Sequence, residues 1–111
     1  MILNKEELLG KLAPKKETVE IEGGEVIVSE IGATALIELY TRKELQDSEG
    51  NWIMSKFTPA LVSLCVVDDA GNRIFADEDI PQLERAAASQ FSKIAQVARR
   101  LNGLAGDEAK N

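Results

Sequence analysis

The segment over residues 57–83 constrains the fold most, because two helix starts and a turn divide it into short elements. Thr58 followed by Pro59 predicts a helix start, since the hydroxyl can cap free amides and proline lacks an N–H that the first turn does not need. An apolar run follows, and the sequence DDAGN at residues 68–72 predicts a turn. Asp77 opens a second predicted helix, whose first turn carries acids that complement the positive end of the helix dipole. Every polar residue of the segment has a structural explanation, which favours a binding protein over an enzyme.

A β-hairpin is predicted closer to the N-terminus. Residues 17–22 alternate between polar and apolar, and a β-branched run over residues 25–29 follows the pair Gly23-Gly24. Glycine tolerates the positive φ angles of the primed turns that join such strands. The alternation places Ile27 on the face opposite to the main apolar face. Four residues are expected to share the main face: Val19, Ile21, Val26 and Val28.

Helices are also predicted over residues 3–12, 33–46 and 77–102. The first begins with a capping-box pair, Asn4 and Glu7. The second has an apolar stripe made of Ala33, Leu36, Ile37 and Tyr40. The third is expected to be one long helix with apolar residues seven apart, namely Ile80, Ala87, Ile94 and Leu101.

Length and composition predict one soluble domain. A chain of 111 residues with 44% hydrophobic and 29% charged residues can form one modest core. The predicted elements indicate an α+β fold, mainly helical, with a small N-terminal β-hairpin packed with about four helices. Gly103 is expected at the C′ position that ends the last helix. The single domain is therefore placed at residues 1–104, and residues 105–111 are expected to be a mobile acidic tail.

The residue types argue against an enzyme. The chain has no histidine, which removes the commonest general base and most zinc sites. Cys65 lies inside an apolar run and is expected to be a small buried hydrophobe. The acids near residues 68–72 do not fit a calcium loop, because the third position counted from Asp68 is Ala70. We therefore expect no catalytic residue, no cofactor and no metal ligand, and a small enzyme is the least favoured reading.

The charge and the hydrophobic pattern limit the partners. A net charge of −6, with basic residues only in pairs such as Arg99-Arg100, argues against nucleic-acid binding. No apolar run approaches the roughly 20 residues that span a membrane. The single cysteine fits a reducing cytosol. We therefore expect a cytoplasmic protein that binds other proteins.

Four residues are the candidate partner contacts: Ile27, Trp52, Ala87 and Phe91. Trp52 is either a core residue at a helix boundary or an anchor for a partner. The alanine run around Ala87 allows another helix to approach closely. A hairpin with apolar residues on both faces and a heptad-spaced helix hold more apolar surface than one small domain covers, which predicts a homo-oligomer.

The order and spacing of several features over residues 17–104 point to a known family. These features are the Val/Ile/Glu hairpin, the helix ending near Arg42-Lys43, Trp52, the apolar helix leading into Cys65-Val66-Val67-Asp68, the pattern Asp69-x-Gly71-x-x-Ile74-Phe75-x-Asp77-x-Asp79-Ile80-x-x-Leu83, and a helix closing at Leu101-Asn102. In this layout the chain resembles the tail assembly chaperones of long-tailed, siphovirus-type bacteriophages.

The resemblance implies a non-enzymatic protein of the infected host's cytoplasm that is absent from the mature virion. Such chaperones bind the tape measure protein, keep it soluble and promote assembly of the tail tube protein around it. The alternative, from another class, is a structural head–tail connector that stays in the virion. No catalytic or binding motif transfers from the family.

The resemblance also implies two products, the longer made by a ribosomal frameshift. Ala109-Lys110-Asn111 can be encoded as GCA-AAA-AAC, which contains the slip heptamer A-AAA-AAC. We therefore expect a slip site at these codons.

Overall fold

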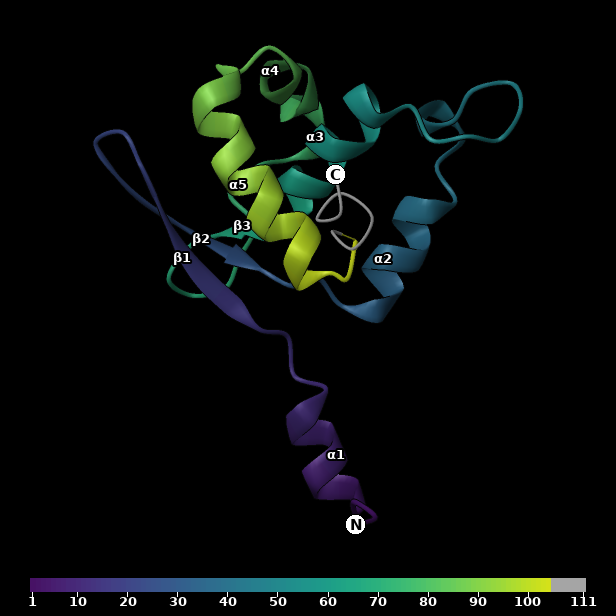
Figure 1. Ribbon diagram of the computed structural model, residues 1–111, viewed down its shortest axis with the longest axis vertical. Helices are drawn as coiled ribbons and strands as arrows, with labels where there is room; N and C mark the ends of the chain where they lie inside the picture. The colour runs from purple at the N-terminus through teal and green to yellow at the C-terminus, as the bar shows by residue number, and fades with distance from the viewer. Residues whose placement is uncertain (105–111) are drawn as a thin grey trace.

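Three antiparallel strands form one small sheet within residues 1–104, which are the residues that the computed structural model describes (Figure 1). The strands are β1 (Lys16–Ile21), β2 (Gly24–Ser29) and β3 (Val66–Val67), in the order β1-β2-β3. Helices account for most of the remaining described chain, so the predicted α+β, mainly helical fold is confirmed. The third strand was not predicted, because two residues carry no measurable alternation. The expected tail and slip site lie outside the described residues.

The hairpin turn lies one residue earlier than expected. Ile21 pairs with Gly24, so the turn consists of Glu22 and Gly23, and only Gly23 has a positive φ, at 86°. The prediction of a primed turn is therefore wrong. The earlier turn shifts the strand register by two residues, which leaves every side chain on its predicted face. The main-face residues accordingly pack in or against the core: Val19, Ile21, Val26 and Val28.

Helix α3 (Met54–Cys65) forms the centre of the core. It begins at Met54 and not at Thr58, so the predicted start was wrong. Pro59 lies inside the helix, where it removes only the hydrogen bond to the carbonyl of Ser55, an exposed residue whose carbonyl water can reach. The fully buried residues of this helix are Ala60, Leu61, Ser63 and Cys65, each 0% exposed.

Helix α2 (Ala33–Tyr40) is shorter than the predicted helix over residues 33–46. The Thr41 hydroxyl donates a hydrogen bond to the Glu38 carbonyl at 2.8 Å, and the chain then becomes extended at Arg42. A separate 3-10 turn, η1 (Lys43–Leu45), places Leu45 in the core. The predicted stripe was also wrong in part: Leu36 and Leu39 pack inward, whereas Ile37 is 62% exposed.

The predicted long helix over residues 77–102 is broken into three pieces. They are η2 (Asp77–Asp79), α4 (Ile80–Glu84) and α5 (Ala88–Leu101). The break allows α4 and α5 to pack separately against α3. The buried face of α5 consists of the small residues Ala95 and Ala98.

The C-terminus of α5 is closed as predicted. Gly103 has φ of +74°, its N–H bonds to the Arg100 carbonyl, and the Leu104 N–H bonds to the Arg99 carbonyl. These are the two hydrogen bonds of a Schellman motif. The Asn102 side chain, half-buried here, donates to the Ala98 carbonyl at 2.7 Å and accepts from the Ile31 N–H at 3.1 Å. This residue therefore joins the end of α5 to the segment between β2 and α2.

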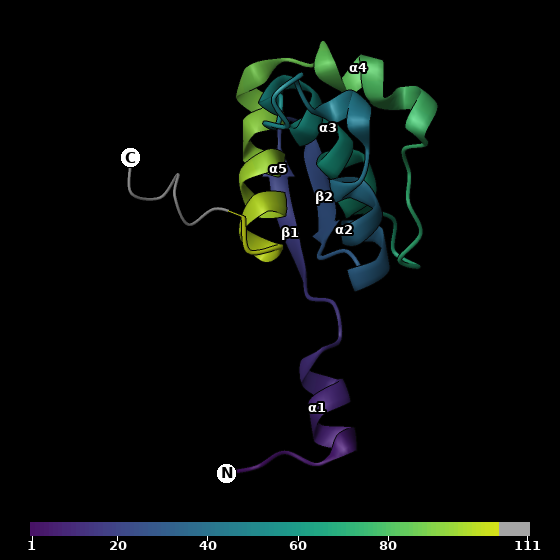
Figure 2. The same cartoon turned by 90° about the vertical axis from the view of Figure 1, so that its right-hand side faces the viewer.

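Helix α1 (Lys5–Lys11) projects away from the body of the molecule, as Figures 1 and 2 both show. Asn4 and Glu7 form the predicted capping box. No residue of α1 is buried. The radius of gyration, 15.0 Å, exceeds the roughly 13 Å of a globular domain of this length, in agreement with an extended arm.

Candidate functional site

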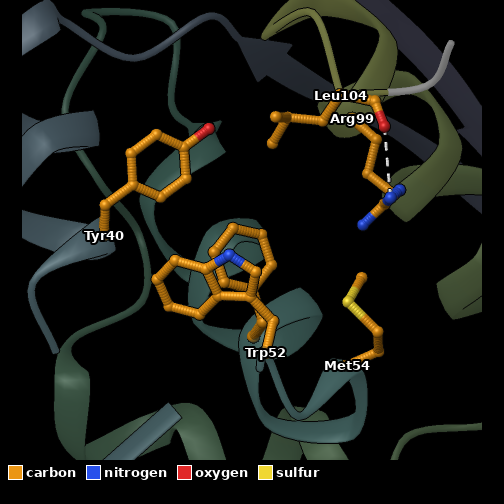
Figure 3. Close-up of a pocket in the computed structure, with 6 residues that line it drawn as sticks. Tyr40, Trp52, Met54, Arg99 and Leu104 are labelled. Carbon is orange, nitrogen blue, oxygen red and sulfur yellow. Dashed lines mark hydrogen bonds between the residues drawn. The ribbon is translucent and has the colours of Figure 1, made fainter. Parts of the chain in front are cut away.

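An apolar groove opens where the ends of α2, α3 and α5 meet (Figure 3). We call it the aromatic groove; its lining consists of Tyr40, Trp52, Met54, Phe57, Arg99 and Leu104. Its volume is about 280 Å³. Figure 3 shows Arg99 and Leu104 on one wall and Tyr40 and Trp52 on the other. Three segments of the chain, at residues 40, 52–57 and 99–104, thus contribute to one hydrophobic surface.

Three of the chain's five aromatic residues form the floor and one wall of the groove. The ring centroids of Trp52 and Phe57 lie 5.0 Å apart, and those of Tyr40 and Trp52 lie 5.6 Å apart. The rings of Tyr40 and Phe57 stack at 6.2 Å. Such pairs fix one another's orientation and contribute about 0.5–1.5 kcal/mol each beyond burial. The groove is therefore a rigid surface.

The one charged residue of the groove lining, Arg99, lies on one wall. The Arg99 Nη2 donates a hydrogen bond to the Leu104 carbonyl at 3.1 Å, as the dashed line in Figure 3 marks. Met54 lies on the same side of the groove as Arg99 in Figure 3 and is 43% exposed. Thioether side chains adapt to irregular apolar partners. The combination of rigid rings, one adaptable side chain and one cation is typical of a surface that binds another polypeptide.

The four predicted partner contacts do not form one surface. Trp52 lies in the aromatic groove, and Phe91 packs against the core from α5. Ala87 is exposed at the break between α4 and α5. Ile27 lies on the other face of the sheet and pairs with Val67. Trp52 packs against the core, as one of its two interpretations expects, and it also lines the groove; its role as an anchor for a partner stays a prediction.

Sequence reasoning missed most of the groove residues. Met54 and Phe57 are not among the predicted partner contacts, and Leu104 lies at the edge of the predicted domain. The signal that indicates them is the spacing Trp52-x-Met54-x-x-Phe57, which brings three large apolar side chains to one helix start. Tyr40 joins them only through tertiary packing.

Asp68, the first acid of the turn at residues 68–72, has structural partners. The Asp68 Oδ1 accepts hydrogen bonds from the N–H groups of Ala70 and Asn72, both at 2.9 Å. The loop over residues 47–51 has the same sequence pattern, D-x-x-G-N, and Asp47 accepts from its own loop in the same way. Among residues 1–104 no cluster of three or more His, Cys, Asp or Glu side chains is placed to hold a metal ion.

Cys65 is buried and its thiol is protonated at neutral pH. Burial raises the pKa of the Cys65 thiol from 9.0 to about 12, and the hydrogen bond from Asn102 opposes this shift in part. The thiolate is the reactive form of cysteine, so this residue is a poor nucleophile.

The raised pKa predicts a pH effect on stability. Above pH 9 the unfolded chain releases the Cys65 proton and the folded chain keeps it, so the free energy of unfolding falls as the pH rises toward 12. We expect the wild-type stability to drop by about 1.4 kcal/mol more than that of Cys65→Ala between pH 8 and pH 10. Urea unfolding of both proteins at both pH values measures this difference. Parallel pH profiles would show that the thiol does not titrate differently in the two states.

Comparison of the chain with protein-family models, with curated proteins and with solved structures finds no match. Within residues 1–104 no helix is both long and apolar enough to cross a membrane. The functional conclusion therefore rests on the groove and on the layout of the sequence.

Proposed function

We propose that this protein is a non-enzymatic binding protein that holds an apolar helical segment of another protein in the aromatic groove. The observation that carries the proposal is the set of three packed rings at an open groove, beside an exposed methionine. Amphipathic helices dock into such grooves through apolar side chains spaced three or four residues apart.

The open shape of the groove favours a helix over a small molecule. Small-molecule sites are usually enclosed and measure about 300–1,000 Å³. The aromatic groove measures about 280 Å³ and is open to solvent. It accepts one or two side chains of a partner and leaves the rest of that partner on the surface.

We further propose that the protein is a tail assembly chaperone of a long-tailed bacteriophage and that its partner is the tape measure protein. The layout of the chain resembles that family, and a tape measure protein is a long helix with apolar stripes. Such a helix needs cover before the tail tube protein surrounds it. The net charge of −6 supports this role, because a like-charged surface keeps a complex with an apolar helix in solution. In this proposal the protein acts in the host cytoplasm and leaves before the virion matures.

Co-expression tests the binding role. The tape measure protein of the same phage is expected to stay in the soluble fraction when it is produced with this protein and to precipitate when produced alone. The matched control is the Met54→Asp variant, which places a charge in the groove at a half-exposed position. Equal solubility with the wild type and the variant would contradict the groove as the binding site.

Mass spectrometry of purified virions separates the chaperone from the alternative, a structural head–tail connector. The chaperone is expected to be absent from the particles and present in infected-cell extracts. A connector would be recovered from the particles in a fixed ratio to the other structural proteins.

A further inference from the structure

The N-terminal arm, residues 1–15, is an apolar element without a partner on its own body. Helix α1 carries a leucine stripe made of Leu8, Leu9 and Leu12, which are 45%, 57% and 65% exposed. Lys5 belongs to the same face, because it precedes these leucines by three, four and seven residues. The arm holds three lysines and two glutamates, a net charge of +1 in a chain of net charge −6. It is thus an apolar stripe with a cation within it.

A second groove has the complementary character. It lies at β2 and β3, and we call it the sheet groove; its lining consists of Glu25, Val26, Ile27, Val67, Asp68, Asp69 and Ile74. Ile27 and Val67 pair across β2 and β3, and Ile74 beside them is 51% exposed. Three carboxylates, from Glu25, Asp68 and Asp69, border this apolar floor. The volume is about 280 Å³.

We propose that the arm of one copy binds the sheet groove of a second copy of this chain. The leucine stripe covers the floor formed by Ile27, Val67 and Ile74, and Lys5 faces the carboxylates at the border. Opposite charges at the rim of an apolar contact set the orientation and select the partner. The occupant is a second copy because α1 is a leucine-bearing helix with no buried residue, and Lys5 on its leucine face is complementary to the carboxylates that border the groove.

The base of the arm directs it away from its own groove. The Lys15 carbonyl accepts a hydrogen bond from the Glu30 N–H at 2.7 Å, and the Lys15 N–H donates to Glu30 Oε1 at 3.1 Å. Pro14, next to Lys15, fixes its own φ and keeps Ala13 out of the helical region. Figures 1 and 2 show α1 pointing away from the sheet and from the rest of the body. A short, anchored connection of this kind favours contact with another molecule over folding back.

The first test is the molar mass in solution, measured by light scattering over a concentration series. The wild-type chain is expected to exceed the monomer mass of 12.1 kDa. A chain with Leu8→Asp and Leu9→Asp is expected to stay monomeric with an unchanged thermal midpoint of its monomer, since α1 contributes no buried residue. A strictly monomeric wild type at high micromolar concentration would overturn the proposal, and so would an arm variant that associates like the wild type.

Mixing two variants tests the contact itself. Ile74→Asp changes the floor of the sheet groove at a half-exposed position and is also expected to be monomeric. Mixed with the arm variant, it should form a heterodimer, because one chain keeps its arm and the other keeps its groove. A contact between two arms would leave Ile74→Asp associated by itself and give no heterodimer in the mixture; either result would overturn the proposal.

A charge exchange tests the orientation of the arm in the sheet groove. Lys5→Glu and Asp69→Lys are each expected to weaken association by roughly tenfold. The two substitutions in one chain should restore most of that loss, because the pair is then reversed and not removed. If the double variant instead lost affinity by the product of the two single losses, Lys5 would not face the carboxylate border.

Discussion

The Ala98→Asp variant is expected to lose the cooperative thermal transition of the wild-type protein. Ala98 is 0% exposed on the face of α5 that packs against α3. An unpaired carboxylate at such a position costs about 3–5 kcal/mol, and the added atoms have no space. Domains of this size are stable by only about 5–15 kcal/mol, so the loss is a large share of the total.

The matched control for this variant is Gln96→Asp. It introduces the same charge two residues earlier on the same helix, at an exposed position. Its midpoint is expected to stay close to that of the wild type, as is that of Glu84→Lys at the exposed end of α4. Ile94→Asp and Leu101→Asp change half-buried positions, so their thermal stability should lie between that of Ala98→Asp and that of Gln96→Asp. A wild-type melting curve for Ala98→Asp would contradict the packing of α5.

The Trp52→Ala variant is expected to weaken binding of a tape measure segment by about thirtyfold or more, which corresponds to about 2 kcal/mol. The ring contributes a wall of the aromatic groove and orients Tyr40 and Phe57 through direct contacts. Isothermal titration with a helical peptide from the tape measure protein measures the dissociation constant.

Two further variants make this result interpretable. Met54→Asp changes the groove without removing a ring, and it is expected to weaken binding to a similar degree. Ile37→Ala removes a large apolar side chain that is 62% exposed on α2 and lies outside the groove lining. It should leave the affinity unchanged. Equal affinities for all three variants would place the binding site elsewhere.

Three features that local signals specify were predicted correctly, although two others, the hairpin turn and the start of α3, were not. The capping box at Asn4, the faces of the hairpin and the Gly103 closure depend on a few neighbouring residues. The helix boundaries that depend on tertiary packing were not. The seven-residue spacing from Ile80 to Leu101 predicts one helix, and nothing local in the alanine run at residues 86–88 indicates the break.

The aromatic groove could be predicted only in part, for a related reason. The spacing of Trp52, Met54 and Phe57 brings three of its side chains to one helix start. The remaining lining residues, Tyr40, Arg99 and Leu104, come from α2 and from the end of α5. Their convergence depends on long-range packing, which a single sequence does not reveal. The projecting position of α1 was hidden for the same reason.

Site-specific crosslinking tests the central claim most directly. A photoreactive residue in place of Met54 lies in the aromatic groove, and the same residue in place of Ile37 lies outside it. In cells that are assembling phage tails, the Met54 position is expected to form an adduct with the tape measure protein, identified by mass spectrometry, and the Ile37 position is not. An absence of this adduct at Met54, or adducts there only with structural proteins of the virion, would contradict the account.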